Sequence, residues 1–269
     1  MLPNTTSGPL EDVEFLVRSE HRVAVLDALA ERPRTRADLR ARTGASASTI
    51  SRILRAFEER NWINRAGDRY EATPLGAFVA TGLRDLLDRF ATERQFRDIW
   101  RWLPSADHGF TVEMVRDAVV TVADVDAPYR PVNRFASLLR STTRFRFVGP
   151  DVGLLEPCRD DLRRRILDGM EAEIIDPPSA AGYVRSTYRD HCAAPLESGN
   201  LTVRLHDDVP PYGVSIFDDR IAISCCDRTT GTVRVLVDTD SPAAREWAES
   251  TFEAYRQEAR PLALEPTAG

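Results

Sequence analysis

Arginine and hydroxyl side chains gather on one side of the segment from Ala45 to Glu59. At 100° per residue its apolar side chains fall on one stripe, and its polar side chains lie opposite. The stripe consists of Ile50, Ile53, Leu54 and Phe57. The opposite side carries Ser48, Ser51, Arg52 and Arg55, with no acidic residue before Glu59. Hydroxyls and guanidiniums contact phosphates and the acceptor atoms of guanine, so we predict a recognition helix that enters the major groove of double-stranded DNA.

Residues near this helix extend the predicted interface. Ser46 precedes the helix and Thr49 lies on its flank, where its hydroxyl can reach a phosphate. The preceding segment adds three arginines as candidates for phosphate contacts: Arg36, Arg40 and Arg42. The alternative is a solvated basic face on an ordinary helix, with the three arginines serving solubility.

Short elements around this helix are expected to position it. Residues 12–31 have apolar side chains at helical spacing, with a restart at Ser19, and Pro33 ends the helical region. Thr35 then opens a short helix, with Asp38 in capping-box position. Gly44 permits a sharp turn into the recognition helix. This order is that of a helix-turn-helix.

A small hairpin is predicted directly after the recognition helix. Two β-prone pieces flank Ala66-Gly-Asp68. In a winged helix such a hairpin is the wing. Arg65 and Arg69 near its tip would meet the DNA backbone or the minor groove.

The distribution of charge supports a basic DNA-binding segment attached to an acidic remainder of the chain. The formal net charge is −6, and all 36 basic residues are arginine. Residues 32–69 hold ten arginines and four acidic residues, so the rest of the chain is strongly acidic. The absence of lysine excludes Walker A phosphate binding, Schiff bases and the His-x-Lys pairs of phospholipase-D-type nucleases.

The first 80 residues resemble a known family of regulators. Four segments carry the resemblance: Ser19-Glu-His-Arg22, Ile50-Ser-Arg-Ile-Leu54, Glu59-Arg-Asn-Trp-Ile63 and Tyr70-Glu-Ala-Thr-Pro-Leu-Gly76. They look like archaeal winged-helix transcriptional regulators of the MarR/ArsR type, and the similarity covers about residues 12–80.

The second half resembles the effector domain of the methanogenesis-regulator-type family. Three segments carry this resemblance: Pro211-Tyr-Gly-Val-Ser-Ile-Phe-Asp-Asp-Arg220, Leu236-Val-Asp-Thr-Asp240 and Arg245-Glu-Trp-Ala248. In that family a winged helix precedes an α/β domain related to the sugar-sensing domain of archaeal TrmB-like regulators. The resemblance implies a homodimer, and we expect the α/β domain to sense a small molecule or a partner.

Other reactive side chains give weaker signals. Cys158, Cys192, Cys225 and Cys226 form no Cys-x-x-Cys pair, so we predict no metal site, and adjacent strand positions send Cys225 and Cys226 to opposite faces. The pairs Asp207-Asp208 and Asp218-Asp219 indicate turns at strand ends. Tyr212 and Arg220 flank a predicted hairpin and are weak candidates for lining a ligand pocket; hairpin packing is the alternative.

The predicted fold class is α+β, with an N-terminal winged helix-turn-helix, a long linker helix and a C-terminal mixed α/β effector domain. The predicted divisions are a flexible N-terminus (1–11), the winged helix (12–80), a linker or dimerisation helix (81–104, reaching Pro104), the effector domain (105–260) and a tail (261–269). No signal peptide and no apolar run long enough to span a bilayer are present, so we expect a cytoplasmic protein without membrane contact.

The predicted function is that of a DNA-binding transcriptional regulator without catalytic residues or cofactor. Two alternatives remain. One is a protein-interaction module whose winged helix does not bind DNA. The other is an α/β enzyme that docks through its winged helix, against which the absence of lysine and of any recognisable catalytic motif counts.

Overall fold

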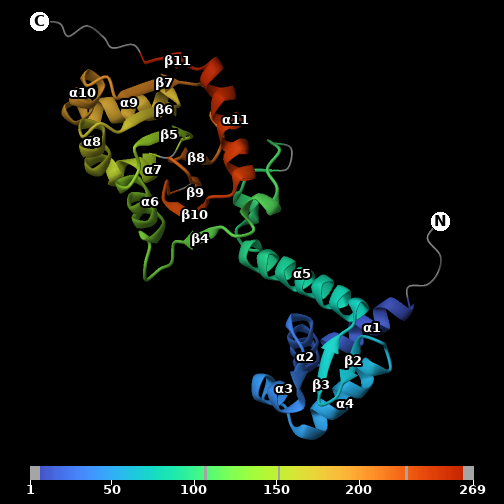
Figure 1. Ribbon diagram of the computed structural model, residues 1–269. Coiled ribbons are helices and arrows are strands. Elements are labelled where there is room, and N and C mark those ends of the chain that lie inside the picture. Colours follow the sequence, from blue (N-terminus) through green and yellow to red (C-terminus); the bar gives the residue numbers. More distant parts are fainter. Residues whose placement is uncertain (1–6, 106–107, 151, 228–229, 263–269) are drawn as a thin grey trace, which may run out of the picture. The chain divides into compact units, whose positions relative to one another are not determined.

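The computed structural model shows a chain of two compact units (Figure 1). The described residues are 7–105, 108–150, 152–227 and 230–262. The first unit comprises residues 1–93 and the second residues 94–269, so the boundary lies inside helix α5 (Pro74–Phe96). Each unit has a buried apolar core of its own, as expected for separate domains.

Helices and a small antiparallel sheet build the first unit. Besides most of α5, the helices are α1 (Ser7–Val17), α2 (Glu20–Glu31), α3 (Arg36–Thr43) and α4 (Ala47–Glu58). The strands β1 (Arg34–Thr35), β2 (Ile63–Ala66) and β3 (Arg69–Ala72) pair in the order β1-β3-β2. Helices α3 and α4 together with the β2–β3 hairpin form the predicted winged helix-turn-helix.

The core of the first unit fixes the orientation of α4. Its predicted apolar stripe (Ile50, Ile53, Leu54 and Phe57) is at most 3% exposed. The stripe belongs to one cluster with apolar side chains of α2 and α3 and with Tyr70 of the wing. Full burial of one such side chain contributes about 1.5–3 kcal/mol. Rotation of α4 would expose the stripe, so the opposite face of the helix is held toward the surface.

Local contacts fix both ends of α3 and the first turn of α5. The Thr35 hydroxyl accepts the backbone N–H of Asp38, whose carboxylate accepts the backbone N–H of Thr35, as the capping box predicted. Gly44 ends α3 with a φ of 67°, a conformation that L side chains rarely adopt. A Cβ on Gly76 would lie 1.8 Å from the carbonyl oxygen of Trp62, so only glycine permits this approach of α5 to the wing.

A mixed sheet forms the centre of the second unit, with strand order β11-β7-β6-β5-β8-β9-β10-β4. Strands β5, β6 and β7 pair in parallel, and the other pairings are antiparallel. The strands are β4 (Val119–Val122), β5 (Arg144–Val148), β6 (Glu171–Asp176), β7 (Leu201–Leu205), β8 (Gly213–Ile216), β9 (Ile221–Cys226), β10 (Val233–Thr239) and β11 (Arg260–Pro261). The helices are α6 (Arg130–Arg140), α7 (Val152–Leu155), α8 (Arg159–Leu167), α9 (Pro178–Thr187), α10 (Arg189–Glu197) and α11 (Pro242–Glu258), with short 3-10 turns at Trp100–Trp102, Val112–Val115 and Glu156–Cys158.

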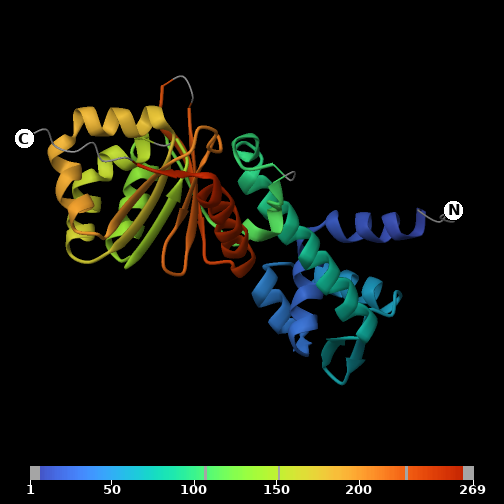
Figure 2. The ribbon, with the colours of Figure 1, turned by 90° about the horizontal axis from the view of Figure 1, so that it is seen from above.

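Helices cover both faces of this sheet (Figure 2). Helix α11 packs on one face, where Val235, Val237 and Trp247 share a core with the residues that follow α5. Helices α6 and α8 pack on the other face, around Phe145 and Leu236. Consecutive residues of β10 thus enter opposite cores, which explains the nearly continuous apolar runs of the central strands. The predicted α+β fold class is confirmed.

Three predicted boundaries are wrong. Helix α1 begins at Ser7, so the predicted flexible N-terminus is helical over 7–11, and residues 1–6 lie outside the described residues. Helix α5 ends at Phe96 instead of reaching Pro104, because Phe96, Ile99 and Leu103 all turn into the core of the second unit. The predicted tail begins too early, since Arg260 and Pro261 pair with β7, whereas residues 263–269 lie outside the described residues.

Asp218 shows how a turn between strands is fastened. Its carboxylate accepts the backbone N–H groups of Thr143 and Arg144 at 2.9 and 2.8 Å and the Thr143 hydroxyl at 3.0 Å. Burial alone raises the pKa of Asp218, but these hydrogen bonds outweigh it and hold the pKa below its ordinary value. The carboxylate therefore ties the β8–β9 turn to the start of β5.

Replacing Asp218 with asparagine is expected to lower the free energy of unfolding by about 1–2 kcal/mol at neutral pH, a modest value because the carboxyl is only half-buried. A depressed folded pKa gives stability that is present above the unfolded pKa of about 3.9 and lost as pH falls through the folded pKa. The difference between the two proteins should therefore shrink below about pH 4. Urea titrations of both across pH check this, with the exposed neighbour Asp219→Asn as the control; an equal loss at every pH would contradict it.

Candidate nucleic-acid interface

The exposed face of α4 begins with a cluster of hydroxyl groups. Ser46 is the N-cap residue, and its hydroxyl accepts the backbone N–H of Thr49 at 3.2 Å. The same oxygen lies 3.0 Å from the Ser48 hydroxyl and 2.9 Å from that of Thr49. Ser46 and Ser48 are exposed, whereas Thr49 and Ser51 are half-buried. No acidic residue stands in the first turn, so the positive end of the helix and its hydroxyls are open to a phosphate.

Arg52 and Arg55 continue this face one and two turns further on. Both are exposed. The Arg55 Nε donates to Glu59 Oε1 at 3.0 Å in a pair whose side chains are 82% and 59% exposed. Such a surface pair contributes about 0.5 kcal/mol or less, so a phosphate can replace Glu59 at little cost. No ion pair within the described ranges involves Arg52.

Arg22 of α2 belongs to the same basic neighbourhood. Burial lowers its pKa, and the nearby charges of Arg52, Arg60 and Arg18 lower it further. Its guanidinium carbon lies 4.1 Å from the centre of the Phe15 ring. Arg22 was not among the predicted DNA-binding residues, because its distance from α4 in the sequence hides their proximity in the fold.

Two of the predicted arginines meet at the wing. The Arg36 Nε donates to the Tyr70 hydroxyl at 3.1 Å, and the Arg36 and Arg65 guanidinium carbons lie 5.5 and 5.7 Å from the centre of the Tyr70 ring. Arg65 also donates to the carbonyl of Gly67 at the hairpin tip. These contacts place charges from α3 and from the wing beside one buried ring.

The remaining predicted arginines lie on the surface of the first unit. Arg69 is exposed and pairs in register with Ala66 at the end of the hairpin. Arg40 is exposed on α3. Arg42 donates to Glu31 at 2.9 Å, and Glu31 also holds the buried Arg34. This contact gives Arg42 a role inside the unit that sequence reasoning missed.

The two ligand candidates of the second unit are not brought together. Tyr212 precedes β8 and Arg220 follows it, at opposite ends of that strand. Tyr212 is buried, which raises its pKa to about 12, and it lines a hollow of about 490 Å³ with Trp102 and Cys225. Arg220 instead donates to Asp238 and Asp240 in a network that holds the sheet to α6. Arg220 therefore does not line the hollow beside Tyr212, and its contacts agree with the alternative of packing within the hairpin.

The cysteines lie as the strand geometry predicted. Cys225 belongs to the core under α11, whereas Cys226 packs against the core under α6. Burial raises the pKa of the Cys158 thiol to about 11, which keeps it protonated at neutral pH. Within the described residues no group of three or more His, Cys, Asp or Glu side chains is arranged to hold a metal ion.

The two units define a class of protein in which a winged helix is joined to a three-layer α/β domain. Residues 10–95 match the family model of the HVO_A0261 N-terminal domain, and residues 128–258 match that of the middle domain of the methanogenesis regulatory protein FilR1. The resemblance of both units to these families of regulators, seen in the sequence, is therefore confirmed. No curated protein matches the chain.

Distant likenesses to solved structures also exist. The archaeal chromatin protein TrmBL2, described with a novel mode of DNA binding, is 12% identical over 94% of this chain and 99% of that chain, with a TM-score of 0.44. NucT from Helicobacter pylori is 14% identical over 54% of this chain and 98% of that chain, with a TM-score of 0.42. In the described part of the chain, no helix is long and apolar enough to cross a membrane.

Proposed function

We propose that this protein is a DNA-binding transcriptional regulator whose helix α4 enters the major groove. One observation carries the proposal: burial of the apolar stripe of α4 holds Ser48, Arg52 and Arg55 toward the surface. Arginine pairs with the acceptor atoms of guanine, and serine with phosphate or base edges. Arg65 and Arg69 of the wing would contact the backbone on either side of that groove.

The second unit is proposed to sense a small molecule or a partner. An effector regulates DNA binding only if its affinity differs between two states of the protein. In each state the two winged helices of a dimer would have a different spacing or a different stability. No catalytic step is assigned to the chain.

We further propose a homodimer formed through helix α5. Five of its large apolar side chains are exposed: Leu75, Phe78, Leu86, Leu87 and Phe90. At 100° per residue all of them except Leu87 fall within an arc of about 120°, so these four form one continuous stripe. Exposed stripes of this kind mark interaction surfaces, and a second copy presents the same stripe for isologous packing.

Replacing both Phe78 and Phe90 with arginine is expected to convert the dimer into a monomer, because two charges would be buried in an apolar interface. Sedimentation equilibrium of the full chain measures the mass. Thr81→Arg, an exposed position on another side of α5, is the control and should leave the dimer intact. A wild-type chain that sediments as a monomer at all concentrations would contradict the proposal.

A mobility-shift experiment tests the proposed function. The full chain should retard DNA from upstream of its own coding region. It should also bind unrelated duplex, with a Kd of about 10⁻⁴–10⁻⁶ M at physiological salt and a lower Kd at low salt. Failure to bind any duplex at low salt would favour a protein-interaction module over a regulator. Retention of upstream binding in the presence of excess unrelated duplex would show specificity.

A further inference from the structure

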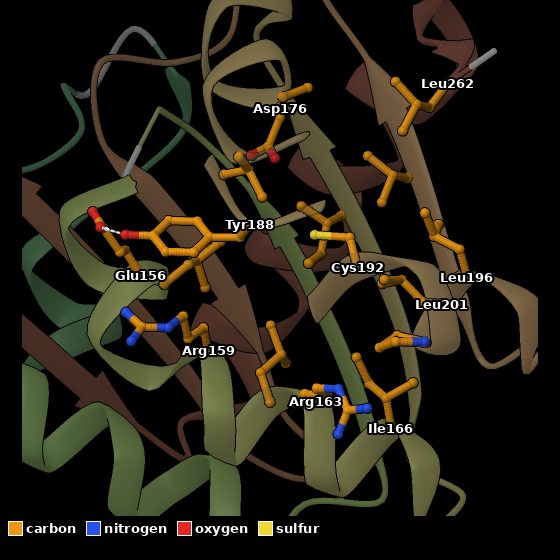
Figure 3. A pocket seen from close by; sticks show the side chains of 17 residues that line it. Glu156, Arg159, Arg163, Ile166, Asp176, Tyr188, Cys192, Leu196, Leu201 and Leu262 are labelled. Atoms are coloured by element: carbon orange, nitrogen blue, oxygen red, sulfur yellow. Dashed lines mark hydrogen bonds between the residues drawn. The ribbon is translucent and has the colours of Figure 1, made fainter. Parts of the chain in front are cut away.

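An apolar cavity lies in the second unit between the helices and the parallel strands (Figure 3). Its volume is about 130 Å³. The walls come from α8, α9, α10, β6 and β7, and most of them are aliphatic, including Leu162, Ile166, Ile174, Leu196, Leu201 and Val203. An engineered apolar cavity of about 150 Å³ stays dry and binds benzene. The space therefore suits an apolar body of about that size.

Two arginines of α8 stand at this cavity. Arg159 and Arg163 both line it, and Figure 3 shows both on the side away from Asp176. The Nε of Arg159 is buried without a hydrogen-bond partner; Asp160, at 3.8 Å, is too far to accept one. No ion pair among the described residues involves Arg163. An unsatisfied buried donor costs about 1–3 kcal/mol, and an acceptor on a ligand would remove that cost.

The acid that lines the cavity near Arg159 is already engaged. Glu156 accepts the hydroxyl of Tyr188 and, at 3.4 Å, that of Tyr183. The hydrogen bond to Glu156 raises the pKa of Tyr188 to about 12, so this tyrosine stays a neutral donor. The Arg159 guanidinium carbon lies 4.9 Å from the centre of the Tyr188 ring, which holds the arginine in place. Positive charge is therefore available to a ligand at this end of the cavity.

We propose that this cavity binds a small monocarboxylate with an apolar body. The body would fill the aliphatic space, and the carboxylate would accept from Arg159 and Arg163 in charge-assisted hydrogen bonds. Asp176, at the other end of the cavity, disfavours a second carboxylate. Binding of a carboxylate in this cavity does not depend on the proposed function. Only an effect of that ligand on DNA affinity rests on the proposed function.

Calorimetry on the full chain tests the proposal with benzoate as the probe. Benzoate should bind with a Kd of about 1 mM or tighter, whereas toluene and protonated benzylamine, which keep the ring but lack the carboxylate, should bind at least about tenfold more weakly. Arg159→Gln with Arg163→Gln should lose at least about tenfold of the benzoate affinity. Arg164→Gln, an exposed neighbour on α8 outside the cavity, should lose none.

A cavity-filling variant tests the location of the site without changing either arginine. Val184→Phe should abolish benzoate binding while the melting temperature and circular dichroism stay those of a folded protein. No binding of benzoate by the wild type, or equal affinity for toluene, would overturn the proposal. Preference for benzylamine would assign the cavity to a cation and would equally overturn it.

Failure of benzoate binding and failure of the proposed function can be told apart. Without benzoate, the double arginine variant should retard DNA as the wild type does, because both arginines belong to the second unit. Benzoate binding in a protein that fails to bind DNA would count against the proposed function alone. DNA binding without benzoate binding would count against the ligand alone.

Discussion

Replacing Asp238 with alanine is expected to lower the free energy of unfolding by about 3 kcal/mol, the lower end of the range for breaking a buried ion pair. Asp238 is fully buried at the end of β10. Its carboxylate accepts Arg134 Nε and Nη2 at 2.9 and 2.7 Å and Arg220 Nη1 at 2.8 Å. The bidentate bond also raises the pKa of Arg134. Without the carboxylate, the guanidiniums of Arg134 and Arg220 lose the buried negative charge between them, and Arg220 keeps only its contact with the exposed Asp240.

The chain offers a matched control for this prediction. Asp240 pairs with the same Arg220 at 3.1 Å, but its side chain is 70% exposed. Asp240→Ala should therefore cost at most about 1 kcal/mol. Urea denaturation of the two variants, followed by circular dichroism, measures both losses. Similar small losses would show that burial of Asp238 adds nothing to the second unit.

Replacing both Arg52 and Arg55 with alanine is expected to weaken DNA binding by about 30-fold or more. Each arginine that contacts a base edge or phosphate contributes about 1–3 kcal/mol. Replacing Arg52 alone should weaken DNA binding more than replacing Arg55 alone, because Arg55 must break its ion pair with Glu59 before it can contact DNA. Both side chains are exposed, so stability should change little.

Fluorescence anisotropy with labelled upstream DNA measures this loss. Arg144→Ala with Arg164→Ala removes the same charge from exposed positions of the second unit and is the matched control. Glu59→Gln should not weaken binding, since it only releases Arg55. If the control weakens DNA binding as much as the double variant of α4 does, net charge rather than the position of α4 governs affinity.

Sequence patterns correctly predicted those elements that depend on contacts between residues close together in the sequence. The apolar stripe of α4, the capping box at Thr35 and the turn at Gly44 all appear as predicted. The alternation that separates Cys225 from Cys226 also holds. In each case the governing contacts lie within a few residues, so spacing alone carries the information.

Contacts between distant segments explain what the sequence did not reveal. The end of α5 depends on the core of the second unit, in which Phe96, Ile99 and Leu103 are buried. The chain also breaks at Tyr188, which ends α9 and precedes α10. Arg159 belongs to the cavity only because α8 packs beside these helices. No periodicity within one segment reports such packing.

The dependence of DNA affinity on salt tests the central claim most directly. A protein that neutralises several phosphates should show a slope of log K against log salt of about −0.9 per phosphate. For Arg52→Ala with Arg55→Ala the slope should become shallower by about 1 for each phosphate that is no longer neutralised, at most about 2 in all. If the wild-type slope is near zero, or if the double variant keeps the wild-type slope and affinity, α4 is not the element that binds DNA.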